Sequence, residues 1–188
     1  MAGLALAPGS YYEVARRGQV FCATAAVTSP GIYSTAAGTG GPLIWNGTGP
    51  LSGTKGLNKV LCVPLALGVG INTASGVAGA LGITGGVSTA PSSTTAIDGI
   101  QNLNLGQTGG PQCNCYRVGT VSAAGTFFIA THQVTTVALT SAPPLSLQWW
   151  DIQGLFVAPP GSFISIAASA TLTSGVFTVG LIFAEIPI

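Results

Sequence analysis

Turn-forming residues interrupt this sequence at short intervals. Their spacing constrains the fold more than any other feature does. Gly occurs 28 times and Pro 12 times in 188 residues, with Ser and Thr clustered beside them. The short runs between these breaks are apolar and rich in β-branched residues, which favour strands. Only the segment 10–18 has helix signals, because Ser10 and Glu13 match a capping box ahead of a glycine stop. The pattern predicts an all-β protein with a short N-terminal helix.

Nine runs have the length and composition of strands, which is enough for a β-sandwich of the jelly-roll type. Pro64 lies inside the third run and lacks an amide hydrogen, so we expect an edge position or a β-bulge there. Apolar residues alternate along the last two runs, which we expect to form a β-hairpin with one face in the core. A turn is expected at the Pro-Pro-Gly bend before them. The predicted strands are 19–27, 41–46, 58–67, 113–122, 126–139, 147–152, 155–158, 162–171 and 176–186.

The length of 188 residues is that of one domain with a short arm. We expect residues 1–18 to form the N-terminal arm and residues 19–188 to form the β domain. Residues 68–112 are rich in Gly, Ala, Ser and Thr and carry one charge, Asp98, so we interpret them as a long loop inserted in that domain. Their apolar side chains favour a loop that packs on a partner, and a mobile segment is the alternative.

Charged side chains are scarce. They make up 5% of the chain, against about 25% in an ordinary soluble domain. A net charge of +1 gives no positive field for a phosphate backbone, so nucleic-acid binding is not expected. Too little charge of either sign makes a free monomer poorly soluble, and we expect other subunits to cover much of its surface. The uncharged stretch 163–184 is interrupted by Ser and Thr and partly alternates, so no membrane helix is predicted.

Side chains that carry chemistry form no recognisable catalytic motif. His132 is the only histidine, no nucleophile-elbow serine accompanies it, and its apolar strand neighbours favour a structural role. The carboxylates Glu13, Asp98, Asp151 and Glu185 lie in no local motif for paired acid–base chemistry. We therefore predict no catalytic residue, no cofactor and no enzymatic activity. A capsule-degrading hydrolase using His132, Asp98 and Asp151 is the enzyme alternative.

The four cysteines, Cys22, Cys62, Cys113 and Cys115, are expected to be buried free thiols. The N-terminus lacks the features of a secretory signal, so no oxidising compartment is indicated. Cys113 and Cys115 are too close in sequence for the usual zinc-ligand pair. On a strand they share one face, where they would act as small apolar core residues. A disulfide and a metal site are the alternatives, and we predict no metal.

The final strand indicates an interface between subunits. On the face of 176–186 that should meet solvent, only Thr178 is polar, so we expect a neighbouring subunit to cover this face. Trp149 and Trp150 point to opposite faces of a strand, which predicts one in the core and the other at an interface. An arginine pair near the N-terminus is expected to dock on an acidic partner or to form a solvated helix end. The predicted interface residues are Arg16, Arg17, Trp149, Trp150, Val176 and Ile182.

The C-terminal segment WWDIQGLFVAPPGSFISIAASATLTSGVFTVGLIFAEIPI has a D-(I/L)-x-G motif, a Pro-Gly bend, a small-residue strand and a closing E-x-P. This order resembles the trimeric jelly-roll proteins of tailed bacteriophages of the decoration, cement or head-fibre knob type. The N-terminal half is similar to that family in YYEVARRGQVF, in Trp45-Asn46 with its Gly-rich turn, and in NKVLCVPL, so only 68–112 is unmatched. The motif positions are Asp151, Ile152, Gly154, Pro160, Gly161, Glu185 and Pro187.

The resemblance implies a homotrimer that binds the major capsid protein or another virion protein. It also implies a location in the virion, after assembly in the host cytoplasm, and no catalytic residues. The expected function is capsid decoration, in which the trimer stabilises the phage head by bridging capsomers. The alternative function is a carbohydrate-binding receptor knob on a tail or fibre.

Overall fold

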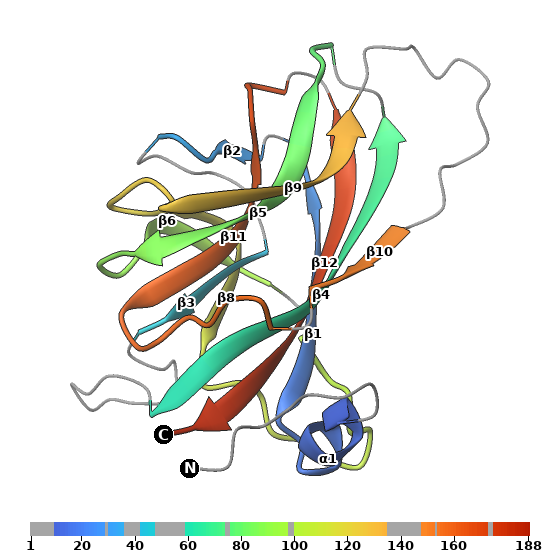
Figure 1. The fold of residues 1–188 in the computed structure, drawn as a ribbon, viewed down its shortest axis with the longest axis vertical. Coiled ribbons are helices and arrows are strands. Elements are labelled where there is room, and N and C mark those ends of the chain that lie inside the picture. Colours follow the sequence, from blue (N-terminus) through green and yellow to red (C-terminus); the bar gives the residue numbers. More distant parts are fainter. Residues whose placement is uncertain are drawn as a thin grey trace.

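The protein forms two antiparallel β-sheets that face each other as a β-sandwich, with one short helix at its lower end (Figure 1). The all-β prediction is therefore confirmed. The predicted helix is also present, as α1, Ser10–Arg16. The computed structural model describes residues 10–28, 30–35, 42–47, 59–73, 76–97, 100–134, 148–152, 154–172 and 175–188.

The first sheet has five strands in the order β10-β4-β12-β1-β7. Its central strand, β12, pairs with β1 on one side and with β4 on the other. Pro64 of β4 lies at a register shift opposite Ile182 and Phe183, so the predicted bulge is confirmed. The strands are β1 Val20–Val27, β4 Val60–Thr73, β7 Gln101–Asn102, β10 Gln148–Asp151 and β12 Val176–Pro187.

The second sheet has seven strands, six of them in the order β6-β8-β3-β11-β5-β9. The seventh, β2, adds to β11 as a short parallel pair. The bend before β11 is a turn as predicted, with Gly161 at a φ of 86°. The strands are β2 Gly31–Ile32, β3 Leu43–Asn46, β5 Gly79–Val87, β6 Ser92–Ala96, β8 Asn114–Thr120, β9 Phe127–Val134 and β11 Ser162–Ala168.

One continuous apolar core fills the space between the sheets. Phe177, Leu181 and Phe183 of β12 are fully buried and belong to the same cluster as Ile164 and Ile166 of β11. In β1, β11 and β12, every second residue belongs to this cluster, as the two-residue period of a strand requires. The alternation predicted for the last two strands therefore selects the correct core residues.

The predicted pairing of these two strands is wrong. β11 lies in the seven-stranded sheet and β12 lies in the five-stranded sheet, so they do not form a hairpin. Their apolar faces meet across the core instead of lying side by side. A pattern of alternation fixes which residues point inward, but it does not distinguish a neighbour in the same sheet from a partner in the facing sheet.

Residues 68–112 are not a long loop, which corrects another prediction. They contain the end of β4 and all of β5, β6 and β7. Small residues are needed in β5 because its neighbours approach closely: a Cβ on Gly82 would lie 2.1 Å from the carbonyl oxygen of Ile129. The expected strand at 155–158 is also wrong, since only Ala158 pairs there, in an isolated bridge with Cys62. Residues 135–139 of the predicted strand 126–139 lie outside the described residues.

Candidate interaction surfaces

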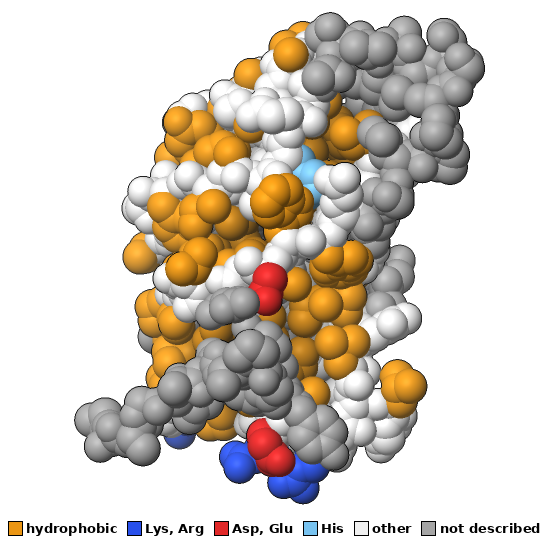
Figure 2. Space-filling view, turned by 45° about the vertical axis from the view of Figure 1, so that its right-hand side comes forward, with side chains coloured by type: hydrophobic (Ala, Val, Ile, Leu, Met, Phe, Trp, Pro, Cys, Tyr) orange, Lys and Arg blue, Asp and Glu red, His pale blue; other side chains and the backbone are white. Residues whose placement is uncertain are grey.

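The predicted interface residues fall in separate places, and Trp150 lies in the cleft at His132. Trp149 and Ile182 share the outer face of the five-stranded sheet, whereas Val176 is half-buried at the start of β12. Arg16 and Arg17 are exposed at α1, and the Arg16 guanidinium donates to Glu13 Oε2 at 3.0 Å. The blue side chains gather at the bottom of Figure 2, and the apolar ones spread over the rest of that face. The structure therefore does not join the arginines and the tryptophans in one site.

Neither tryptophan enters the core, so that prediction is wrong. Both side chains are 45% exposed, and their strand, β10, is at the edge of its sheet, next to β4. Trp149 lies flat against the outer face of its sheet, where a Cβ on Gly68 would meet its ring at 2.9 Å and one on Gly180 at 3.1 Å. These glycines leave room for the ring, which covers part of an otherwise apolar face.

An open apolar hollow of about 380 Å³ lies on the same outer face. Beside it, Val63 and Ala184 are buried under the helix residues Val14 and Ala15, which form a second hydrophobic cluster. Of the residues that the structure describes, those of the helix cover this end of the sheet and leave the hollow open. It is lined by Ala15, Val20, Leu65, Ala66, Leu103, Asp151 and Ile182.

The outer face of the seven-stranded sheet is closed by contrast. Leu43, Trp45 and Phe163 are buried there together with Val121 from a loop. The segments 31–35 and 121–125 lie over this face, and Gly125 N–H donates to Tyr33 O at 3.2 Å, which ties the two covers together. The space left beneath them is only about 20 Å³. The chain covers this face with its own residues.

A second exposed apolar patch lies at the end of β5 and in the segment before β11. Val87 is 73% exposed, Leu155 is 76% exposed and Val157 is 46% exposed. Val87 and Val157 line a groove of about 200 Å³ together with Phe127 and Phe156, whose ring centroids are 4.5 Å apart. Single exposed apolar residues are ordinary on protein surfaces, but a group of this kind is typical of contact sites.

A polar cleft of about 280 Å³ lies between the open edges of the two sheets. Trp150 Nε1–H of β10 donates to His132 Nε2 of β9 at 2.9 Å, and the two rings pack edge to face. His132 Nδ1 lies 2.9 Å from Thr131 Oγ1. Burial lowers the pKa of His132, which favours the neutral ring that this hydrogen bond requires. The side chains of Gln133 and Gln148 also line the cleft.

The acidic residues do not join His132 in a catalytic arrangement that the structure describes. Glu185 is buried, and its two carboxylate oxygens accept hydrogen bonds from the backbone N–H groups of Gln112 and Cys113. Asp151 lies at the hollow, and Asp98 lies outside the described residues. Among the residues described, no three His, Cys, Asp or Glu side chains are placed to hold a metal ion.

All four cysteines are free thiols, and three of them are buried, as predicted. Cys113 and Cys115 do share one face, since both belong to the main core cluster. Contact with Cys62, followed by desolvation, raises the pKa of Cys113. Desolvation raises the pKa of Cys115 as well. Cys22 is half-buried, so the prediction that it is buried holds only in part.

The chain matches no known protein family, no curated protein and no solved structure. In the described parts of the chain, no helix has the length and apolar character needed to cross a bilayer. The surfaces described above are therefore what a functional proposal has to rest on.

Proposed function

We propose that this protein is a structural component of a virus particle, a capsid decoration protein whose jelly-roll domain forms homotrimers and bridges capsomers. The motifs shared with phage decoration proteins support this role, and so do the all-β sandwich and the scarcity of charge. A protein of this kind acts by burying surface at each contact, so it needs no catalytic group. Its N-terminal region is proposed to contact the capsid.

The observation that carries the proposal is the open apolar hollow on the outer face of the five-stranded sheet. Leu65, Leu103 and Ile182 line an open hollow there, with one carboxylate, Asp151, among the lining residues. A free sandwich would show polar side chains at such outward positions. We propose that a second copy of the chain covers this face, because a chain with 5% charged residues has few other ways to stay soluble.

The presence of two different apolar surfaces favours a closed ring. One surface is the hollow, and the other is the exposed patch of Val87, Leu155 and Val157. Contact between two different surfaces of a chain is heterologous, and it closes into a ring when the rotation between subunits allows it. A trimer is the ring implied by the resemblance to the decoration proteins.

The oligomeric state tests this proposal directly. We expect native mass spectrometry of the full chain at micromolar concentration to show a trimer. Ile182→Lys should shift the population to monomers, because it places a charge in the hollow. Thr95→Lys on exposed β6 is the matched control and should leave the trimer intact. A wild-type chain that stays monomeric at this concentration overturns the proposed interface.

Capsid attachment needs a second experiment. Particles assembled with the chain should resist heat or dilution better than particles assembled without it, and electron microscopy should locate added density on the outside of the shell. Particles that contain no copy of the chain would contradict the virion role, whatever its oligomeric state.

The cleft at His132 supports a second candidate, the carbohydrate-binding knob. A half-exposed tryptophan and two glutamines surround a cleft that holds no charged residue among its described lining. Sugars are often bound in this way, with hydrogen bonds to neutral side chains and an aromatic ring against the apolar face. Binding to a glycan array should be lost in Trp150→Ala and kept in Trp149→Ala, whose ring lies on the other side of the strand.

A further inference from the structure

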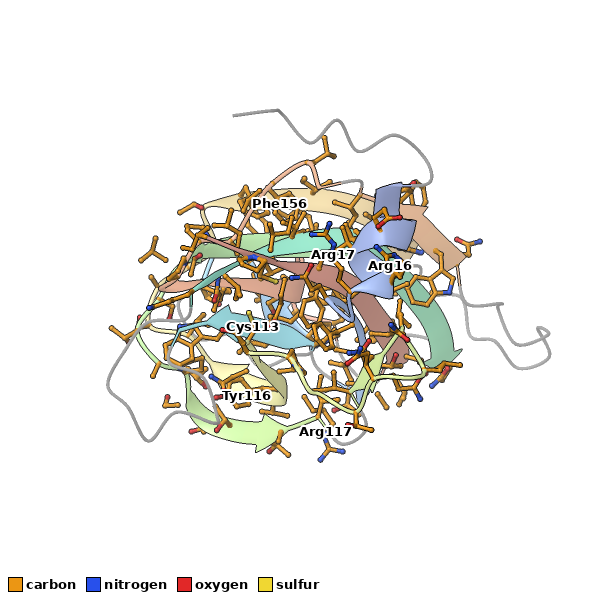
Figure 3. All side chains as sticks on the ribbon, turned by 90° about the horizontal axis from the view of Figure 1, so that it is seen from below. Arg16, Arg17, Cys113, Tyr116, Arg117 and Phe156 are labelled. Atoms are coloured by element: carbon orange, nitrogen blue, oxygen red, sulfur yellow. The ribbon has the colours of Figure 1, made fainter. Side chains whose placement is uncertain are left out.

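Two buried cysteines connect the opposing sheets at one end of the core. Cys62 belongs to β4 of the five-stranded sheet, and Cys113 directly precedes β8 of the seven-stranded sheet. Both side chains are at most 1% exposed and lie in the same hydrophobic cluster. Cys113 is in the interior of the molecule, whereas Arg117, four residues further along, points outward (Figure 3).

Glu185 and Ala158 hold the two cysteine backbones in place. Glu185 is the register partner of Cys62 in the ladder between β12 and β4. Its Oε1 accepts a hydrogen bond from Cys113 N–H at 2.7 Å, so one side chain spans from the strand beside Cys62 to Cys113. Cys62 also exchanges two backbone hydrogen bonds with Ala158, at 3.0 and 2.8 Å. The approach of the two cysteines is therefore fixed by ordered backbone on both sides.

Glu185 brings the two cysteines close together, because it is the register partner of Cys62 and accepts the hydrogen bond from Cys113 N–H. In agreement with this geometry, interaction with Cys62 is the first cause of the raised pKa of Cys113. Cys115 also lies near Cys62, which contributes to its raised pKa after desolvation, but its Sγ lies 3.9 Å from the carbonyl oxygen of Cys113 and Glu185 does not link its backbone to β12. Cys22 lies near Thr24 Oγ1, at 3.6 Å, outside the core cluster. The hydrogen bond through Glu185 therefore favours Cys62 and Cys113 as the pair.

We propose that Cys62 and Cys113 form a disulfide between the two sheets when the chain meets a low-molecular-weight disulfide such as oxidised glutathione. One cysteine thiolate attacks a sulfur of the oxidant, which forms a mixed disulfide and releases one glutathione thiolate. The second cysteine thiolate then attacks the mixed disulfide and displaces the other glutathione. The protein loses two electrons and two protons, and one oxidised glutathione becomes two reduced ones.

Burial determines when this reaction occurs. The thiolate is the reacting form, and the raised pKa of Cys113 keeps its thiol protonated in the folded chain. Oxidation should therefore be slow in the native protein and fast while the chain folds or opens. Once formed, the disulfide is buried in the core. It closes a loop of about 50 residues, which lowers the conformational entropy of the unfolded chain. The proposal does not depend on a virion role, since a monomer forms the same bond.

The test compares two preparations of the full chain, refolded with reduced glutathione or with a mixture of its oxidised and reduced forms. Peptide mapping of the wild type without reduction should show a Cys62–Cys113 cross-link only in the second preparation. The thermal midpoint should be about 10 °C higher with the cross-link than after reduction with dithiothreitol. Free cysteines after oxidative refolding, or a Cys113–Cys115 cross-link, would overturn the proposal.

Two variants make the assignment specific. Cys115→Ser keeps the proposed pair, so its midpoint should still respond to dithiothreitol. Cys62→Ala removes one partner, so its midpoint should not respond, and Cys113 should be found free or joined to glutathione. If either variant fails to fold, the peptide map of the wild type still shows which cysteines are cross-linked. A response to dithiothreitol in Cys62→Ala would show that another pair is responsible and would contradict the assignment.

Discussion

The outer faces of the two sheets are both apolar, but they are covered in different ways. On the seven-stranded sheet, Leu43 and Phe163 are buried together with Val121, and the segments 31–35 and 121–125 leave a space of only about 20 Å³ beside them. On the five-stranded sheet, α1 and the Trp149 ring are the described parts of the chain that lie over the surface, and a hollow of about 380 Å³ remains beside them. Outward strand positions that are equally apolar thus belong to the core on one side and to an accessible surface on the other.

This difference shows that apolar outward residues have two distinct explanations. A sheet face can be apolar because the same chain folds over it, or because another molecule does. The first case predicts a large loss of stability when a residue is truncated in the isolated chain. The second case predicts a small loss of stability in the isolated chain and a large loss of stability in the assembly. Each of the following experiments measures one part of that contrast.

The largest effect is expected on the covered face. Phe163→Ala should lower the free energy of unfolding by about 3–5 kcal/mol, because it leaves a cavity under the loops. Ile182→Ala on the open face should lower it by only about 1–2 kcal/mol, since that side chain is already half-exposed. Urea unfolding of dilute, monomeric protein measures both. Equal losses would mean that the two faces do not differ as described.

An intermediate effect is expected where Trp149 covers the open face. Gly68→Ala should destabilise the chain by about 1–3 kcal/mol, because the new Cβ would lie 2.9 Å from the ring and displace it. The emission of Trp149 should shift to longer wavelength as the ring moves into water. Gly109→Ala is the control, since its Cβ would meet nothing within 4 Å. An unchanged spectrum in Gly68→Ala would show that the ring does not lie on the sheet.

A smaller effect of about 1 kcal/mol is expected at the sandwich edge, where Trp150 joins His132. Burial lowers the pKa of His132, so the unfolded state binds its proton more readily than the folded state does. The histidine's contribution to stability is therefore present above about pH 6.5 and is lost as the pH falls through the lower folded-state value. Thermal unfolding between pH 7 and pH 5 should show this decline. His132→Gln should show a shallower decline, and an identical slope would contradict the assignment.

The smallest effect is expected at the helix that covers one end of the open face. Arg16→Ala removes the ion pair with Glu13, whose two side chains are 59% and 57% exposed. Such a pair contributes less than about 0.5 kcal/mol, and salt weakens it further. Urea unfolding at low and high salt should therefore differ little from the wild type. A loss above 1 kcal/mol would indicate that α1 holds the sheet face more firmly than its contacts suggest.

Much of the architecture follows from local patterns in the sequence. Alternation in β11 and β12 identifies Ile164, Ile166, Phe177 and Leu181 as core residues, and Pro64 marks the bulge in β4. The predicted hairpin between β11 and β12 is wrong, because the two strands lie in opposite sheets. The sequence does not predict β5, because its glycines are typical of a loop. In the structure, these glycines allow β9 to approach β5 closely.

The surfaces were less predictable than the core. The apolar face around Ile182 was visible in the sequence, but the hollow also needs Leu103 and Ala15, which come from distant segments. The contact between Trp150 and His132 joins the edges of two sheets, and no spacing in the sequence signals it. The Cys62–Cys113 pair likewise spans two sheets, and four cysteines alone leave several pairings open.

The sequence by itself determined that this chain forms strands, which residues of β11 and β12 point inward, and that charge is too scarce to cover its surface. These properties depend on the two-residue period of a strand and on composition, so they can be read locally. Only the tertiary structure decided which strands pair, which apolar face the chain covers with its own loops, and which cysteines meet. Those outcomes depend on contacts between residues far apart in the chain, whose arrangement is set by packing and not by any local pattern.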